Sequence, residues 1–373
     1  MTAGDVGILK STLLPSFGLY SGLSVAAYVV AESTDRVEIK DWLWPSAQVL
    51  NAWLTAIGRP MYETGITLPD AWRGLTWSEK LLLSGVTVWG TRLFARIVSR
   101  SLARGKDDPR YEAQKKERGF WKTALLKIFL TEAAFLSLIS LPLTVPFGMG
   151  DTTLSVSTNM LSTVRALGVA LFSAGFALEV VADTQLELHR KEREDLCRHG
   201  VWSLVRHPNY LGDTLVHLSF ALINITDSFN PIVLLGPLAN YLFLRLVGGD
   251  KTTEESQEKR YREQDSHKYE QLCNWRGVKN SVWPALKDLT NPWALVVVGC
   301  GLIGVVTEEA VRSTFTMRYL SLQTWSSAAG LIAAQSQADD RNPDQPVRIM
   351  ASDHHTLKSS LPSTQSARHN AVS

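Results

Sequence analysis

Long apolar runs alternate with densely charged stretches along this chain. The runs lie at residues 13–31, 42–58, 79–98, 124–147, 160–181, 214–225, 229–247 and 291–306. Most approach the roughly 20 helical residues that a bilayer core requires, but 214–225 is too short to span, and 42–58 is short and rich in tryptophan, as at a membrane interface. Pro142 and Pro146 should bend or end the helix at 124–147. The pattern therefore predicts an all-α, polytopic membrane protein built as a bundle of helices.

The charges between these runs predict an orientation. The segment at 99–122 is dense in lysine and arginine, the segment at 148–159 has neither, and the segment at 183–200 is basic again. Basic segments stay on the cytosolic side of a membrane. We therefore expect residues 100–122 and 183–212 to share the cytosolic face, and residues 148–159 to lie on the opposite face.

Composition excludes one class of partner and argues against one kind of site. The chain has 38 Lys and Arg against 36 Asp and Glu, so there is no cationic surplus to neutralise a nucleic-acid backbone. Cys197, Cys273 and Cys300 lie far apart, and we expect neither a disulfide framework nor a metal centre. From about residue 335 the sequence is polar and lacks apolar periodicity, which predicts a disordered tail whose adjacent histidines are incidental.

A glycine motif at residues 296–304 matches the G-x-G-x-x-G pattern of dinucleotide-binding sites. Such a site also needs a second strand that ends in an acidic residue about 20 positions further on. No Asp or Glu occurs between Ala310 and Ala338, and the flanking sequence is that of a membrane segment. We therefore interpret these glycines as small residues that let membrane helices pack closely.

Polar residues gather in the stretch GVWSLVRHPNYLGD, residues 200–213, directly before an apolar run. We call this stretch the polar signature. Gly200 should stop the preceding helix, and Pro208 should turn the chain at His207. Arg206 and His207 stand at the mouth of a predicted membrane segment, where ionisable groups are costly unless they are paired or bind something.

The residue types of the polar signature suit a nucleotide ligand. The fork of Arg206 can bind phosphate oxygens, and Asn209 can donate and accept as an amide-bearing ring requires. Tyr210 offers a flat face and a hydroxyl, and Asp213 can accept from a ribose hydroxyl or hold an arginine. The alternative is an Arg-His pair that only anchors a helix at the membrane surface. These residues alone leave both interpretations open.

The polar signature resembles the G-x-W-x-x-x-R-H-P-N-Y-x-G-[DE] signature of the sterol and steroid 5α-reductase superfamily. Further segments are similar to elements of its microbial and fungal branch: WGTRLFARIVSRSLARGKDDPRY at 89–111, EVVADTQ at 179–185, EKRYREQDSHKYEQ at 258–271 and KNSVWP at 279–284. The resemblance covers about residues 80–290. It divides the chain into N-terminal membrane segments at 1–75, a reductase-like membrane domain at 76–310 and the polar tail at 335–373.

The resemblance implies a membrane enzyme of the endoplasmic reticulum whose cytosol-facing C-terminal half binds NADPH. It would reduce a C=C bond of a lipophilic substrate, sterol-like or another lipid, taken from the bilayer. Matching motif positions imply that the cofactor contacts Asp183, Arg190, Trp202, Arg206, His207, Asn209, Tyr210, Asp213, Tyr261, Lys268 and Tyr269. The cations for a diphosphate and a 2′-phosphate would be Arg190, Arg206, Arg260 and Lys268.

Reduction of a C=C bond also needs a proton donor and a site that excludes water. Tyr111 and Asp213 are the candidate catalytic residues. Glu132 is a further candidate because a buried carboxyl can keep its proton, but it can equally pair with Lys127 or Arg165. The donor elements of steroid 5α-reductases have no match in the N-terminal half of this chain, which argues against a steroid substrate.

Two alternatives from other classes remain open. Isoprenylcysteine carboxyl methyltransferases, which bind S-adenosylmethionine, have a similar R-H-P-x-Y-x-G stretch, and their Asn-Pro and Glu-Glu pairs are matched at Asn230-Pro231 and Glu254-Glu255. Their pattern lacks the Asn-Tyr-x-Gly-acid combination of residues 209–213. The other alternative is a non-enzymatic membrane scaffold or sterol sensor, against which the intact polar signature argues. The sequence identifies neither the substrate nor the oligomeric state.

Overall fold

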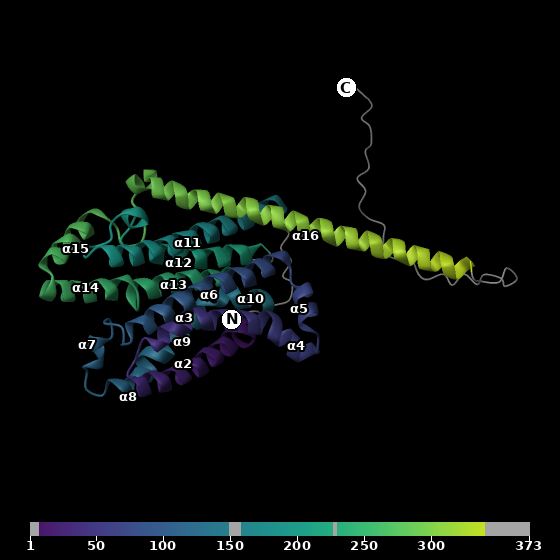
Figure 1. The fold of residues 1–373 in the computed structure, drawn as a ribbon. Coiled ribbons are helices and arrows are strands. Elements are labelled where there is room, and N and C mark those ends of the chain that lie inside the picture. Colours follow the sequence, from purple (N-terminus) through teal and green to yellow (C-terminus); the bar gives the residue numbers. More distant parts are fainter. Residues whose placement is uncertain (1–6, 149–157, 227–229, 340–373) are drawn as a thin grey trace, which may run out of the picture. The chain divides into compact units, whose positions relative to one another are not determined.

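Every regular element in the described part of the chain is a helix (Figure 1). The computed structural model describes residues 7–148, 158–226 and 230–339. Five helices are long and apolar enough to cross a membrane: Leu9–Thr34, Trp77–Arg104, Met160–Glu192, Pro231–Gln264 and Pro292–Met317. The bent pair Phe120–Ile139 and Leu141–Gly148 adds a sixth when it is counted as one span. These helices confirm the predicted all-α, polytopic membrane protein.

The elements follow one another along the chain, with π-helices and 3₁₀ helices labelled η. They are η1 (Leu9–Leu13), α2 (Leu14–Thr34), α3 (Ile39–Trp53), η2 (Leu54–Gly58), α4 (Arg59–Thr64), α5 (Leu68–Gly74), α6 (Trp77–Arg104), α7 (Glu112–Lys115), α8 (Phe120–Ala124), η3 (Leu125–Leu130), α9 (Thr131–Ile139), α10 (Leu141–Gly148), α11 (Thr158–Glu192), η4 (Gly200–Ser203), α12 (Pro208–Ile225), η5 (Pro231–Leu234), α13 (Leu235–Leu246), α14 (Asp250–Gln264), α15 (Ser266–Val278), η6 (Leu286–Thr290) and α16 (Pro292–Asp339). One compact unit ends at Ser313, and a second begins at Thr314 within α16.

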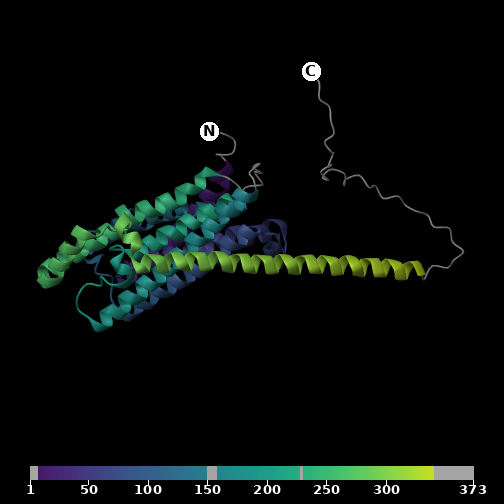
Figure 2. The ribbon, with the colours of Figure 1, turned by 90° about the horizontal axis from the view of Figure 1, so that it is seen from above.

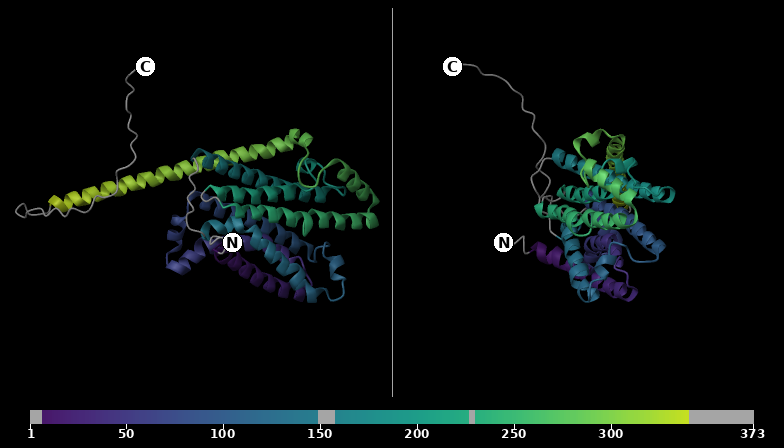
Figure 3. Two further views of the ribbon diagram at one scale, coloured as in Figure 1. Left: turned by 180° about the vertical axis from the view of Figure 1, so that it is seen from behind. Right: turned by 90° about the vertical axis from the view of Figure 1, so that its left-hand side faces the viewer.

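The long helices of the first unit run side by side, as Figures 1, 2 and 3 show from different directions. Helices α7 and α15 lie at one end of this bundle, and α4 and α5 lie at the other. The chain bends by 56° between α9 and α10. Pro142 is the second residue of α10 and offers no backbone N–H to the preceding turn, which confirms the predicted bend.

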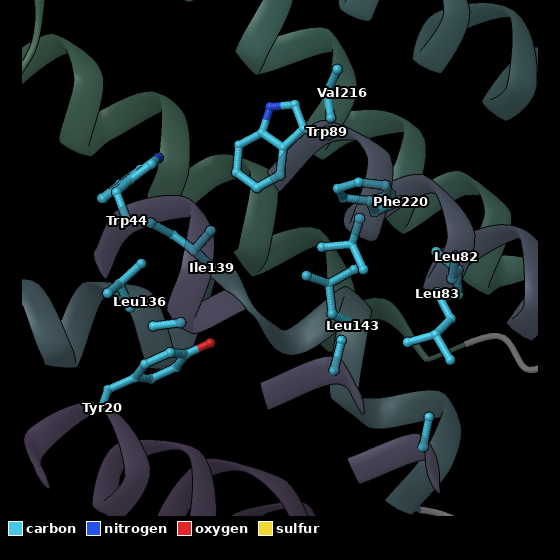
Figure 4. Close-up of a cluster of buried hydrophobic side chains, with 14 of the residues drawn as sticks. Tyr20, Trp44, Leu82, Leu83, Trp89, Leu136, Ile139, Leu143, Val216 and Phe220 are labelled. Carbon is cyan, nitrogen blue, oxygen red and sulfur yellow. The ribbon is translucent and has the colours of Figure 1, made fainter. Parts of the chain in front are cut away.

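One apolar core joins the N-terminal helices to the rest of the bundle (Figure 4). Tyr20 of α2 and Trp44 of α3 are buried together with Leu83 of α6, Leu136 of α9 and Phe220 of α12. Burying one large apolar side chain stabilises a fold by about 1.5–3 kcal/mol. The N-terminal segments, which lie outside the family resemblance noted above, therefore fold as part of the same bundle.

Helices α11 and α12 pack backbone against backbone. A methyl group built on Gly212 would lie 2.6 Å from the carbonyl oxygen of Gly175, and one built on Gly175 would lie 2.7 Å from that of Gly212. A carbon atom does not tolerate such distances, so this approach requires glycine at both positions. The contact sets Gly212 of the polar signature directly against Glu179 of α11.

The helix before the polar signature ends earlier than predicted. Helix α11 ends at Glu192, and not at Gly200. After Glu192 the chain turns back. The Nε2 atom of His189, in the last turn of α11, lies 2.9 Å from the carbonyl oxygen of Asp195 and so connects the segment that follows the helix to its last turn. Gly200 instead adopts a left-handed φ of +63° at the start of η4.

The predicted turn at His207 and Pro208 is confirmed. His207 is the N-cap of α12, and Pro208 is the first residue of that helix. Proline suits this position because the first helical N–H has no partner within the helix. Helix α12 therefore carries Asn209, Tyr210 and Asp213 on its first turns.

Two expectations fall largely outside the described residues. Most of the segment at 148–159, expected on the non-cytosolic face, is not described, and neither is the predicted polar tail beyond Asp339. Helix α16 continues to Asp339, well past the apolar run at 291–306 that opens it.

Candidate functional site

A cavity of about 890 Å³ lies among α3, α6, α11, α14, α15 and the polar signature. Ten of the sequence-predicted residues line it: Asp183, Arg190, Trp202, Arg206, His207, Asn209, Tyr210, Asp213, Tyr261 and Lys268. Its wall also includes Lys40, Asp41 and Trp44 of α3, so the pocket is not confined to the C-terminal half. This volume falls in the range of sites that enclose organic ligands and cofactors.

Four arginines that line the cavity carry no carboxylate partner in the described part of the chain. We call Arg100, Arg190, Arg193 and Arg260 the arginine rim, because all four are also exposed to solvent. The guanidinium of Arg260 donates to the Tyr261 hydroxyl at 3.3 Å and stacks over that ring. Guanidinium groups without carboxylates keep their donors available, so the arginine rim is suited to bind phosphate groups.

Arg206, in contrast, is paired within the protein. Its Nε lies 2.9 Å from Glu254 Oε1, its Nη2 lies 3.3 Å from Oε2, and its Nη1 donates to the carbonyl oxygen of Lys279 at 2.8 Å. Only 13% of its side chain is exposed. Arg206 therefore connects the polar signature to α14, and these partners compete with the phosphate that the sequence predicts for it.

His207 shares the same carboxylate. Its Nε2 lies 2.8 Å from Glu254 Oε1, and its ring stacks on Tyr210 with centroids 5.3 Å apart. Burial lowers the pKa of His207, although the Glu254 carboxylate opposes this shift. The neutral imidazole therefore donates its Nε2–H to Glu254 and presents a ring platform with Tyr210 at the cavity wall.

Asn209 has an unused hydrogen-bond acceptor. Its Oδ1 atom is buried and has no hydrogen-bond partner among the described residues, and Asn209 lines the cavity. A buried amide oxygen without a donor is costly, and a ligand with an N–H group would satisfy it. Of the polar-signature residues, Asn209 fits its predicted ligand-binding role best.

Acidic residues line the cavity where α11 meets the start of α12. Arg92 pairs with Glu179 at 2.8 Å and with Asp183 at 2.5 Å, so both carboxylates have a cation. No arginine or lysine pairs with Asp213 in the described residues: Asn240 Nδ2 donates to it at 2.8 Å, and His217 Nδ1 lies 3.6 Å away. The predicted role of Asp183 as a direct cofactor ligand therefore competes with its bond to Arg92.

Tyr111, the other candidate catalytic residue, lies behind the cavity wall. Tyr111 is not a lining residue, and its hydroxyl donates to Asp41 Oδ1 at 2.8 Å. Arg110 pairs with the other oxygen of Asp41 at 2.8 Å. Burial alone would raise the pKa of Asp41, but the adjacent Lys40 and Arg110 charges and the Tyr111 hydroxyl lower it to about 2. Tyr111 can therefore act on a ligand only through Asp41.

Glu132 lines the cavity, and its ion-pair partner is neither Lys127 nor Arg165, the two that the sequence suggested. Its Oε2 lies 2.6 Å from the ammonium nitrogen of Lys40, whereas Arg165 lies 3.4 Å from Glu308. The sequence did not single out Lys40 because it lies outside the recognised motifs. The cavity floor is thus a buried Lys40–Glu132 ion pair next to Asp41.

The chain matches the model of a known protein family. A family described as "Protein of unknown function (DUF1295)" matches residues 27–273. The chain belongs to this family. The match begins within α2 and ends within α15, and every residue that lines the cavity except Trp275 falls inside it. No curated protein and no solved structure matches the chain.

The DUF1295 match starts well before residue 80, where the motif resemblance began, and so includes the α3 wall of the cavity. One predicted cofactor residue within it lies elsewhere. Tyr269 does not line the cavity. Its hydroxyl oxygen lies 3.1 Å from Arg262 Nη2, and its ring centroid lies 5.2 Å from the central guanidinium carbon of Arg262. Arg100 and Arg193 of the arginine rim were missed, because they lie in basic segments that the sequence could assign only to the cytosolic face.

Proposed function

We propose that this protein is an NADPH-dependent membrane oxidoreductase that reduces a C=C bond in a lipophilic substrate. The observation that carries the proposal is the arginine rim, four guanidinium groups on one cavity of about 890 Å³ that have no carboxylate partner among residues 7–148, 158–226 and 230–339. Free nucleotide diphosphates and 2′-phosphates are anions that such a set would bind. The motif similarity to the steroid 5α-reductase superfamily supports the same assignment and a location in the endoplasmic reticulum.

The cavity residues divide between the parts of the cofactor. The arginine rim would hold the phosphates, and the buried Oδ1 of Asn209 would accept from the carboxamide of the nicotinamide ring. The stacked rings of His207 and Tyr210 would give that ring a flat surface. NADPH supplies a hydride when bound. Arg206 supports this arrangement from behind by fastening the polar signature to Glu254.

A lipophilic substrate would bind at the apolar part of the cavity. Trp44 and Phe243 both line it, and their rings stack with centroids 4.7 Å apart. Leu93 and Ile97 of α6 add aliphatic surface. Such a wall excludes water from the reacting atoms and favours a substrate that partitions into the bilayer.

Asp213 is the best-placed proton donor for this reaction. It lines the cavity, is buried, and has the Asn240 amide and the His217 imidazole as neighbours. Burial favours the neutral form of a carboxyl, so Asp213 is suited to keep its proton and to deliver it to the substrate carbon that the hydride does not attack. Glu132 is less suited, because Lys40 already neutralises it.

Ligand-dependent thermal stability of the detergent-purified chain tests the proposal. NADPH should raise the unfolding temperature more than NADH at equal concentration, because only NADPH carries the 2′-phosphate. Arg190→Gln should weaken NADPH binding about tenfold while leaving the unliganded unfolding temperature unchanged, since Arg190 has no ion pair to lose. Arg118→Gln is the matched control, because Arg118 is exposed and lies away from the cavity.

The same assay distinguishes the alternatives. Stabilisation by S-adenosylmethionine and not by NADPH would establish the methyltransferase instead, and no stabilisation by either would favour a scaffold. Two features that resemble the methyltransferases have structural partners here. The side chain of Asn230 caps η5 by accepting from Ile232, and Glu254 is held by Arg206 and His207. Mass spectrometry of lipids that copurify with the protein would then identify the substrate.

A further inference from the structure

Three potential metal ligands meet where α11 ends. One nitrogen each of His189 and His199 and the sulfur of Cys197 lie within 4.8 Å of one another. His189 and Cys197 are buried, with 4% and 5% of their surfaces exposed, whereas His199 is exposed. Ligand atoms around one tetrahedral zinc ion lie roughly 3–4 Å apart, so small side-chain rotations would bring this group to coordination distance.

A second observation points to a ligand at this cluster. The Nε2 atom of His189 lies 2.9 Å from the carbonyl oxygen of Asp195 and 3.2 Å from its carboxylate, so this nitrogen carries the proton. The Nδ1 atom therefore has a free lone pair, and it is buried without a hydrogen-bond partner in the part of the chain that the structure describes. An imidazole whose other nitrogen donates to a carboxylate or carbonyl is the usual arrangement of a metal-bound histidine.

We propose that His189, Cys197 and His199 bind a zinc ion. A thiolate and two imidazoles match the preference of Zn²⁺ for sulfur and nitrogen, whereas Mg²⁺ and Ca²⁺ prefer oxygen ligands. The Cys197 thiol loses its proton to solution on binding, and the fourth position is open to water. Cysteine spacing alone does not reveal the site, because two of its three members are histidines in an H-x7-C-x-H sequence.

The position of the cluster gives the ion a structural task. It would tie the last turn of α11, which ends at Glu192, to the segment that leads into η4. Arg190 and Arg193 of the arginine rim lie within the stretch closed by this tie. The zinc ion would therefore fix the cavity wall at its basic side, and the proposal stands independently of which anion the cavity binds.

Metal content of the full-length protein tests this inference. The chain is purified in detergent with a tag that lacks histidines, loaded with Zn²⁺, and freed of excess metal by gel filtration. Elemental analysis should find about one zinc ion per chain, and Co²⁺ in its place should give a thiolate-to-cobalt charge-transfer absorption. The cobalt spectrum of the wild type needs no variant, so it tests the site even if substitutions impair folding.

Variants locate the ion. Cys197→Ser should abolish the cobalt–thiolate absorption, and His189→Gln should lower zinc affinity at least about tenfold. Cys273→Ser is the matched control, because Cys273 is exposed and lies outside the cluster. A double substitution, His354→Ala with His355→Ala, excludes the adjacent histidines near the C-terminus. A wild-type chain that retains no zinc, or a Cys197→Ser protein with the wild-type cobalt spectrum, would overturn the inference.

Discussion

The Arg206 guanidinium and the Glu254 carboxylate lie side by side, with Nε–Oε1 and Nη2–Oε2 distances of 2.9 Å and 3.3 Å. Arg276 approaches the same carboxylate from α15 at 3.0 Å, and His207 does so from the start of α12 at 2.8 Å. One buried acid thus connects three helices around the cavity. The arginine of the polar signature serves this connection, and in the proposed function the phosphates would bind the arginine rim instead.

Removing Arg206 should therefore destabilise the fold. Arg206→Gln leaves Glu254 in a buried site with one cation fewer, which we expect to cost about 2–4 kcal/mol in the free energy of unfolding. Glu254→Gln should cost a similar amount, and the double variant less than the sum, because each single change breaks the same contact. Thermal unfolding of the detergent-purified proteins without ligand measures all three.

Arg262→Gln is the control for the Arg206 and Glu254 substitutions. Arg262 pairs with Glu258 on α14, but 63% of its side chain is exposed. Exposed ion pairs contribute only about 0–1 kcal/mol, so this variant should unfold close to the wild type. If Arg206→Gln unfolded like Arg262→Gln and lost only ligand binding, the original assignment of Arg206 as a phosphate ligand would be restored.

The fold class could be predicted from the sequence because membrane-spanning helices require long apolar runs that are visible in it. Runs such as 79–98 and 160–181 are long, apolar and separated by basic segments, and both became spanning helices. The polar signature was equally informative, since its proline and its ionisable residues at a membrane border have few explanations. The structure placed that signature on the cavity that also gathers Asp183, Arg190 and Tyr261.

What the sequence could not predict were partners from distant segments. Glu254 satisfies Arg206 from 48 positions away, and Lys40 satisfies Glu132 from 92. A single sequence shows that a charge needs a partner but not which one it finds. The same holds for Tyr111, which looked available for catalysis until the structure placed its hydroxyl on Asp41. Pairing of this kind follows from tertiary packing and not from local pattern.

The glycine contact between α11 and α12 predicts a sharp difference between two substitutions. Gly212→Ala would place a methyl group 2.6 Å from the carbonyl oxygen of Gly175 and should destabilise the protein by about 2 kcal/mol or more, since backbone must move. Gly22→Ala in α2 meets nothing within 4 Å and should be neutral or stabilising by up to about 1 kcal/mol, because alanine favours helix. Unfolding temperatures of the two variants in one detergent decide the matter, and equal values would contradict the close approach.

Asp41 predicts a specific acid sensitivity. Its pKa is about 2 in the folded protein and near 3.8 when unperturbed, so the unfolded chain binds its proton first as the pH falls. The stabilisation from this carboxylate is complete above about pH 5, and it is lost as the pH drops from about 4 to 2. Asp41→Asn should lower stability at neutral pH by roughly 2 kcal/mol and flatten the decline over that acid range. Unfolding followed from pH 6 to pH 2.5 tests this, with Glu117→Gln at an exposed position as a control whose acid profile should stay near that of the wild type.

The two ends of the bundle should face opposite sides of the membrane. Helices α7 and α15 lie at one end, and α4 lies at the other (Figure 1). The basic segments adjoin the end that holds α7 and α15, so that end should face the cytosol.

Labelling of cysteines tests this orientation. In sealed vesicles of known orientation, a membrane-impermeant maleimide should label the native Cys273, which is exposed, from the cytosolic side. In a Cys273→Ser background, Lys116→Cys should be labelled from that same side and Glu63→Cys only from the other, because both positions are exposed and lie at opposite ends. The Cys273→Ser parent alone gives the background from the two remaining cysteines. Labelling of positions 63 and 116 from one face would show that the charge alternation does not set the orientation of this bundle.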